Sequence, residues 1–151
     1  MLFITDSAGV PSVAKMVQVA KGPNPLMSAV RDTGAGRCVD VPGSTLTTGT
    51  YLQSHTCNST KAQALSRLPG DSTLRVLGNC IDVPSSNFAS GQRVWTWRCN
   101  GTMAQRWSFR TDGTIRPAAN ANLCLAAAST SPDAAVRLST CSTSSLQRWT
   151  W

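Results

Sequence analysis

The sequence predicts an all-β domain in which three tandem repeats close around a pseudo-threefold axis. One unit recurs three times, with a period of about 42 residues. Each unit contains a cysteine, a loop, a second cysteine and then a glutamine. The members of the unit that recur in steps of 42 are Gln63, Gln105 and Gln147, together with Cys57, Cys99 and Cys141. Composition agrees, because all seven acidic residues are Asp, which prefers turns, and none is Glu, which favours helix surfaces.

The middle unit, residues 78–107, shows this pattern most completely, from Cys-Ile-Asp to Gln-Arg-Trp. We place the domain at residues 26–151, with repeats at about 26–68, 69–112 and 113–151. Residues 1–25 lie outside the repeat and are predicted to be an N-terminal extension or linker. Their start, Met-Leu-Phe-Ile-Thr-Asp, has no basic residue and its apolar run stops early, which disfavours a signal peptide. Val13 to Lys21 fits a short strand or helix.

Each repeat is predicted to supply about four short strands, or about twelve in all. Ser28 to Arg31 leads into a turn at 32–36, and alternating patterns cover 51–55 and 93–97, just before the second cysteines. A further strand is expected at 71–76 in one copy and at 112–116 in the next. Abundant Gly, Ser, Thr, Asn and Pro suit the turns between them. Closing the repeats into one ring hides the strand edges.

The six cysteines fall two to a repeat, with no Cys-x-x-Cys pattern of a zinc ribbon or redox site. Six cysteines allow fifteen pairings, but equivalent positions of a repeat should pair equivalently. The favoured pairs are Cys38 with Cys57, Cys80 with Cys99, and Cys124 with Cys141. Each disulfide would contribute roughly 3 kcal/mol in the chain-entropy model. Disulfides indicate an oxidising compartment, so a secreted protein is expected.

A formal net charge of +7 raises the question of a nucleic-acid partner. The basic residues are scattered singly, with no run of three, so nucleic-acid binding is not predicted. No stretch approaches the roughly 20 apolar residues that span a bilayer, so membrane insertion is not predicted either.

The residues from about 26 to 151 resemble the ricin B-type lectin domain, a β-trefoil also classed among carbohydrate-binding modules. The resemblance rests on three units of about 42 residues with Cys-x-Asp, an aromatic residue before the second cysteine, and Gln-x-Trp. It implies a β-trefoil of three repeats. Trp107 and Trp149 are then expected to fill the central core, where Leu65 is their smaller counterpart and leaves looser packing.

The resemblance also implies where a sugar would bind. A pyranose needs paired acceptors and donors for its hydroxyls and an aromatic ring for its apolar face, and Asp, amide and aromatic side chains supply these. In the first repeat the matching residues are Asp40, Gln53, His55, Asn58 and Gln63. His55 stands at the platform position, although the alternative that it is only a solvent-facing loop residue stays open.

In the middle repeat the matching residues are Asp82, Trp95, Trp97, Asn100 and Gln105. Residues i and i+2 of a strand point to the same face, so the two tryptophans are expected to widen the platform. The third repeat departs from the pattern, because Ala126 replaces the aspartate and Ser139 replaces the aromatic residue. We interpret it as a structural copy without a sugar site.

The sequence therefore predicts a carbohydrate-binding lectin module for galactose- or xylose-type glycans or polysaccharide, with shallow pockets in repeats 1 and 2 and no cofactor or metal. An enzyme is not predicted, because the chain has no Glu, one His and no Gly-x-Ser-x-Gly elbow. The alternative is a cell-surface-targeting or receptor-binding subunit of a larger toxin or secreted hydrolase. In that case a linked catalytic domain would be a further partner.

Overall fold

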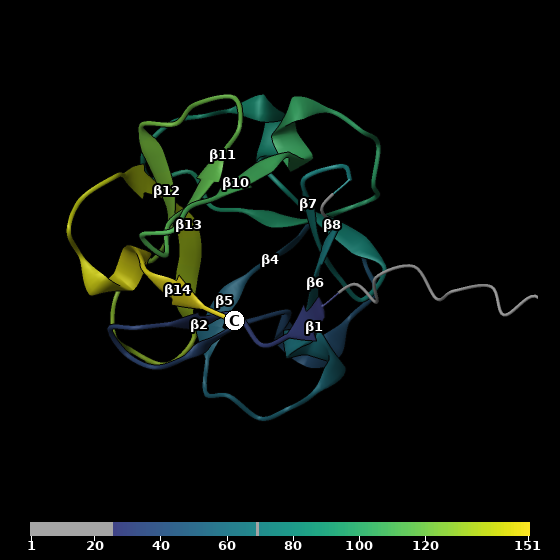
Figure 1. Ribbon diagram of the computed structural model, residues 1–151. Coiled ribbons are helices and arrows are strands. Elements are labelled where there is room, and N and C mark those ends of the chain that lie inside the picture. Colours follow the sequence, from purple (N-terminus) through teal and green to yellow (C-terminus); the bar gives the residue numbers. More distant parts are fainter. Residues whose placement is uncertain (1–25, 69) are drawn as a thin grey trace, which may run out of the picture.

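The computed structural model describes residues 26–68 and 70–151 (Figure 1). The extension predicted for residues 1–25, with the short strand or helix within it, lies outside the described residues. The described part holds fourteen short strands and five 3-10 helices, and it contains no α-helix. Figure 1 shows three lobes around a common centre, as the tandem repeats predict.

The first repeat contains six short strands because two of its four strand positions are broken. The first position is divided into β1 (Leu26–Ser28) and β2 (Arg31–Asp32), and the third into β4 (Thr50–Tyr51) and β5 (Gln53–His55). The second and fourth positions are β3 (Cys38–Asp40) and β6 (Leu65–Leu68). The turn expected at 32–36 is held by the Asp32 carboxylate, which accepts hydrogen bonds from the backbone N–H groups of Ala35 (2.6 Å) and Arg37 (3.1 Å).

The second and third repeats supply four strands each, as predicted. Those of the second repeat are β7 (Thr73–Val76), β8 (Asn79–Asp82), β9 (Trp95–Trp97) and β10 (Trp107–Phe109). Those of the third are β11 (Ile115–Pro117), β12 (Leu123–Ala127), β13 (Ala134–Thr140) and β14 (Trp149–Thr150).

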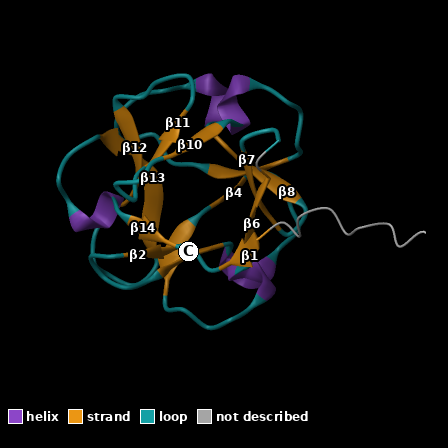
Figure 2. Ribbon diagram, in the orientation of Figure 1, coloured by secondary structure: helices purple, strands orange, loops and turns teal. Residues whose placement is uncertain are grey.

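The five 3-10 helices are η1 (Pro42–Ser44), η2 (Lys61–Gln63), η3 (Pro84–Ser86), η4 (Met103–Gln105) and η5 (Ser145–Gln147). They lie at the outside of the lobes (Figure 2).

All strand pairs are antiparallel, and five of them, β4–β9, β6–β7, β10–β11, β5–β13 and β2–β14, join different repeats. One sheet has the order β1-β6-β7-β8-β9-β4, another is β12-β13-β5-β3-β2-β14, and β10 pairs with β11 alone. The register is the same in every repeat, because Asp40 lies opposite Gln53, Asp82 opposite Trp95, and Ala126 opposite Arg137. The repeat in the sequence is therefore a repeat in space.

A closed triangle of backbone hydrogen bonds ties the three repeats together. The N–H of Leu52 donates to the carbonyl of Val94 (3.1 Å), Val94 donates to Val136 (3.2 Å), and Val136 donates to Leu52 (3.1 Å). These three residues are fully buried and occupy equivalent positions, 42 residues apart. The triangle leaves no free strand edge at the centre, which is the closure that the repeats require.

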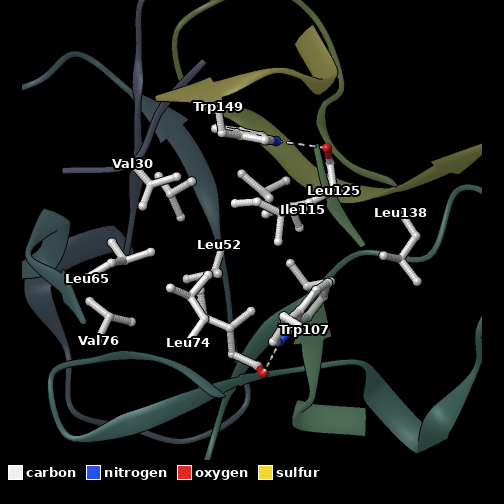
Figure 3. Close-up of a cluster of buried hydrophobic side chains, with 14 of the residues drawn as sticks. Val30, Leu52, Leu65, Leu74, Val76, Trp107, Ile115, Leu125, Leu138 and Trp149 are labelled. Carbon is white, nitrogen blue, oxygen red and sulfur yellow. Dashed lines mark hydrogen bonds between the residues drawn. The ribbon is translucent and has the colours of Figure 1, made fainter. Parts of the chain in front are cut away.

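The hydrophobic core lies on the same axis (Figure 3). Trp107 is 1% exposed and its indole N–H donates to the Ile81 carbonyl (3.0 Å), while Trp149 donates to the Leu125 carbonyl (2.9 Å). The expectation that both tryptophans fill the core is confirmed. Leu65 is also fully buried but has no N–H to offer, so the first repeat lacks this side-chain bond.

The three disulfides join the predicted pairs, Cys38–Cys57, Cys80–Cys99 and Cys124–Cys141. No cysteine is free. In each repeat the disulfide ties the strand that carries the Cys-x-Asp position to the segment that follows the next strand. The two sides of the candidate site are thereby linked covalently. No helix in the described residues is long and apolar enough to cross a bilayer.

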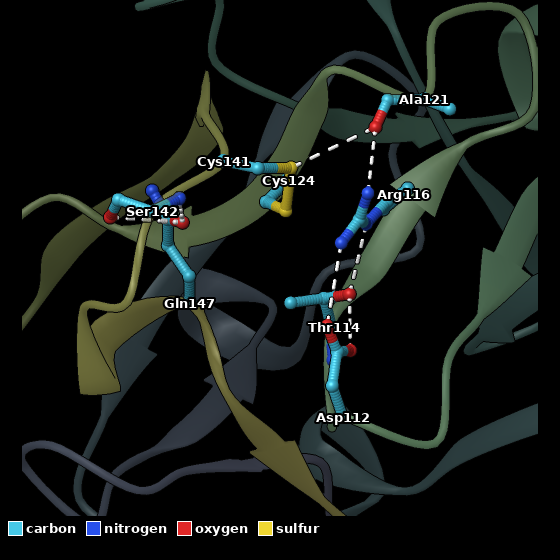
Figure 4. A network of polar contacts seen from close by, with 8 residues as sticks. All are labelled: Asp112, Thr114, Arg116, Ala121, Cys124, Cys141, Ser142 and Gln147. Atoms are coloured by element: carbon cyan, nitrogen blue, oxygen red, sulfur yellow. Dashed lines mark hydrogen bonds and ion pairs between the residues drawn. A yellow bond between two sulfur atoms is a disulfide. The ribbon is translucent and has the colours of Figure 1, made fainter.

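An Asp-x-Thr-x-Arg turn opens the second and third repeats. The Thr114 hydroxyl and backbone N–H donate to the Asp112 carboxylate, and Arg116 lies 3.4 Å from it (Figure 4). The Thr114 hydrogen bonds, and then the charges of Arg116 and Arg148, hold the pKa of Asp112 below its usual value. At the equivalent turn, burial raises the pKa of Asp71, but Thr73 and Arg75 outweigh it and the net shift is downward.

Asp112→Asn is expected to lower the free energy of unfolding at neutral pH, since the ionised carboxylate is favoured in the folded state. A depressed pKa gives stability above the unfolded-state value, and this stability is lost as the pH falls through the folded-state value. Urea unfolding of both proteins across the acid range should therefore show a difference that disappears at low pH. A difference that is independent of pH would contradict this assignment.

Candidate functional site

The first two repeats hold a buried aspartate in the same way. In the first, Gln63 donates from its amide nitrogen to Asp40 (3.1 Å) and to the Thr56 carbonyl (3.0 Å). In the second, Gln105 donates to Asp82 (3.0 Å) and to the Arg98 carbonyl (2.9 Å). The glutamine of the Gln-x-Trp position thus fixes the carboxylate.

A second donor reaches each carboxylate from the neighbouring strand. Gln53 donates its amide N–H to Asp40 (2.9 Å), and Trp95 donates its indole N–H to Asp82 (2.7 Å). Trp95 therefore replaces Gln53 as a donor, which the sequence pattern did not reveal. A carboxylate has about four lone-pair sites, so each aspartate keeps acceptor capacity for a sugar hydroxyl.

The two glutamines lie deeper than predicted for residues that contact a sugar. Gln63 is 1% exposed and Gln105 is fully buried. Their side-chain oxygens accept the backbone N–H of Asn58 and of Asn100, each at 2.9 Å. All their polar atoms are thus used inside the protein, and we correct their role from sugar contact to positioning of the aspartate.

The two asparagines form the outer turn of each site. The side-chain oxygen of Asn58 accepts the backbone N–H (3.1 Å) and hydroxyl (2.8 Å) of Thr60, and Asn100 does the same with Thr102. Their amide NH₂ groups form no protein hydrogen bond in the described structure, so they are the donors that each turn leaves for a ligand.

The two tryptophans of β9 stack on each other. Their ring centroids are 4.9 Å apart and their planes differ by 15°. They point to the same side of the strand, as the i, i+2 spacing predicts, but each covers one face of the other. The platform is therefore not widened by two coplanar rings, and Trp97 alone stands at the outer end of the stack.

A shallow hollow of about 350 Å³ lies over the second repeat. It is lined by Asp82, Val83, Ser85, Ser86, Trp95, Trp97, Asn100, Thr102 and Ala104. The predicted acceptor, platform and turn residue of this repeat thus share one concave surface. The small side chains from η3 and η4 leave room for a ligand above the carboxylate.

The first repeat contributes to this second site, which the sequence did not predict. Because β4 pairs with β9, Tyr51 lies opposite Trp95, with ring centroids 5.6 Å apart. The Arg93 guanidinium lies 4.6 Å from the centre of the Tyr51 ring. A ladder of one cation and three aromatic rings thus crosses from the first repeat to the second.

His55 is half-buried at the rim of the first site. Its Nδ1 contacts the carboxylate of Asp133, which comes from the loop between β12 and β13 in the third repeat. A carboxylate only accepts, so this contact orients the imidazole with its Nδ1–H toward Asp133. The contact holds the ring in place, and the role of His55 in ligand binding stays a prediction. The contact spans 78 residues, so no local pattern could have predicted it.

The third repeat keeps the glutamine but lacks the carboxylate. Gln147 accepts the backbone N–H of Ser142 at 2.7 Å (Figure 4). It also donates to the Thr140 carbonyl (2.9 Å), as its counterparts do. Ala126 lies where the aspartates stand, and Ser139 lies where Trp97 and His55 stand. The predicted constellation is therefore present twice and incomplete once. No group of three or more His, Cys, Asp or Glu side chains that could hold a metal occurs in residues 26–68 and 70–151.

The fold and the repeated aspartate, amide and aromatic arrangement define a β-trefoil of the lectin type. The sequence profile of the ricin-type beta-trefoil lectin domain matches residues 73–151, which is more than half of the chain. The chain belongs to this family of ricin-type lectin domains, and its fold is a carbohydrate-binding fold.

Solved structures agree with the fold. A non-toxic homologue of type II RIPs from Momordica charantia, in complex with alpha-methyl-D-galactoside, is 22% identical with a TM-score of 0.71, over 82% of this chain and 46% of that one. The C-half of an earthworm R-type lectin in complex with GalNAc is 12% identical with a TM-score of 0.66, over 83% and 97%. The designed threefold-symmetric protein ThreeFoil is 20% identical with a TM-score of 0.71, over 80% and 94%. No curated protein sequence matches the chain significantly.

Proposed function

We propose that this chain is a secreted lectin module that binds galactose- or xylose-type glycans or polysaccharide through the sites of repeats 1 and 2. The observation that carries the proposal is the hollow of the second repeat, where Asp82, Trp97 and Asn100 converge. The carboxylate offers acceptors for vicinal hydroxyls, the indole offers a face for the C–H side of the ring, and the amide offers donors. The sugar complexes of the Momordica and earthworm proteins support this class of ligand.

The two sites are proposed to differ in character. The second has the aromatic stack and the hollow, so stacking dominates there. The first has Asp40, Gln53 and a histidine fixed by Asp133, so hydrogen bonding dominates there. The hollow of the second site is shallow, so weak binding at a single site is expected. Two sites on one rigid body act together, which would raise the overall affinity for a polymer or cell surface.

A glycan array with the disulfide-intact protein tests the proposal, comparing the wild type with Asp40→Ala and Asp82→Ala. Both substitutions should fold, because the third repeat already carries Ala126 at this position. Galactose- or xylose-type ligands should bind the wild type, and each substitution should weaken the binding. Absence of any glycan binding by the wild type, or unchanged binding in both variants, would refute the proposed sites.

The second candidate is a targeting role within a larger protein. The chain spans about half of the Momordica homologue and 31% of the hemolytic lectin CEL-III, which it resembles at 22% identity with a TM-score of 0.73. In such an arrangement the trefoil would deliver a linked catalytic domain to a glycan-bearing or receptor-bearing surface, and the trefoil itself would not be an enzyme. Sequencing the complete natural transcript would test this, since a single-domain product would exclude a covalent partner.

A further inference from the structure

The third repeat keeps a donor opposite the position where the other repeats hold their aspartate. Gln53 and Trp95 each donate an N–H to the carboxylate directly opposite. The equivalent donor in the third repeat is Arg137 on β13, and the residue opposite it on β12 is Ala126. Here the donor has become a permanent cation and the acceptor has been removed.

Arg137 is left without a partner inside the described structure. Its side chain is half-buried, its Nε is buried with no hydrogen-bond partner, and it forms no ion pair with a described residue. A buried donor without an acceptor costs free energy, and more so when it is charged. In the other two repeats the aspartate prevents this cost.

The charges around Arg137 also favour an anion. Its backbone pairs with that of Arg93 at an isolated β-bridge, so a second basic residue, whose guanidinium lies over the Tyr51 ring, faces it across the strands. Like charges at directly opposite positions are destabilising. The nearby loop carries Asp133, but that carboxylate contacts His55. A negative group from outside the protein would therefore complete the site.

We propose that the third repeat binds the carboxylate of an acidic sugar residue, such as a uronate, with Arg137 as its partner. The ligand carboxylate lies beside the position of the aspartate that Ala126 has replaced. It accepts two parallel hydrogen bonds from the terminal nitrogens of the planar guanidinium, which are not buried as Nε is. The inference rests on the proposed glycan-binding function for the class of ligand. It gives the third repeat a negatively charged ligand, whereas the sequence predicts only a structural copy without a sugar site.

The test is an NMR titration of the ¹⁵N-labelled, disulfide-intact full chain with a galacturonate trimer and with a neutral galactose trimer. The galacturonate trimer should shift the Arg137 Nε–H resonance, and the neutral trimer should not. Arg137→Gln should weaken galacturonate binding about tenfold, as loss of a charge-assisted pair predicts. Arg110→Gln removes the same charge from an exposed arginine of the β10–β11 turn and should change the affinity less than about twofold.

Ala126→Asp provides the opposite test. Asp40 and Asp82 are 5% exposed and Ala126 is 3% exposed, so the repeat should accept the carboxylate. The new side chain should pair with Arg137, raise the melting temperature and abolish galacturonate binding. A more stable protein that no longer binds cannot be explained by misfolding.

Three results would overturn the inference. One is an Arg137 resonance that galacturonate does not move, and another is an equal loss of affinity in Arg137→Gln and Arg110→Gln. The third is equal affinity for a sulfated galactose trimer, since the site would then recognise charge and not a carboxylate. Failure of neutral sugars to bind while galacturonate still binds through Arg137 would refute the sites of repeats 1 and 2 and leave this one standing.

Discussion

Trp97→Ala is expected to abolish most retention of the protein on a galactose- or xylose-containing polysaccharide matrix. The indole ends the aromatic stack of β9 and lines the hollow above Asp82, so its removal takes away the surface against which a sugar ring packs. Affinity electrophoresis at several polysaccharide concentrations measures the retention. The unfolding temperature should change little, because Trp97 is only half-buried.

Ser139→Ala is the matched control, because Ser139 holds the same position in the third repeat. It should leave neutral polysaccharide retention unchanged. Equal loss from both substitutions would show that retention does not depend on the second site. Trp95→Phe separates two roles of the stack, since it keeps a ring beside Trp97 but removes the N–H that Asp82 accepts.

Trp107→Ala is expected to destabilise the fold by about 3–5 kcal/mol, the range for deleting a large buried aromatic side chain. Trp107 is 1% exposed in the central core and its N–H satisfies the Ile81 carbonyl. Its loss leaves both a cavity and an unpaired acceptor, and the second effect adds to the first. Urea unfolding followed by circular dichroism measures the change without relying on tryptophan fluorescence.

Trp107→Leu should cost clearly less than the alanine substitution, because Leu65 fills the equivalent position of the first repeat. Trp151→Ala, at a ring that is 42% exposed and touches Phe109 by its edge, should cost less than about 1 kcal/mol. If alanine at 107 cost no more than alanine at 151, the core assignment would be wrong.

The repeat, the fold class and the disulfide pairing could all be predicted from the amino-acid sequence. The repeat and the cysteine pairs follow from spacing, because a recurring unit places equivalent residues at equivalent positions once the repeats close. The all-β class follows from composition and alternating patterns, and the β-trefoil is what the resemblance to the ricin B-type lectin domain implies. Asp40 and Asp82, Trp107 and Trp149, and the three cysteine pairs accordingly lie where the pattern predicts.

The contacts of each site residue depend on how the repeats pack against one another. Whether Gln105 faces a ligand or the interior depends on how its turn folds back onto Arg98 and Asp82. Likewise, Tyr51 meets Trp95 and Asp133 meets His55 because strands and loops of different repeats pack side by side. Such contacts join residues that are distant in the chain, so no periodicity encodes them. The unpaired donor of Arg137 likewise becomes visible only when the strand pairing places Ala126 opposite it.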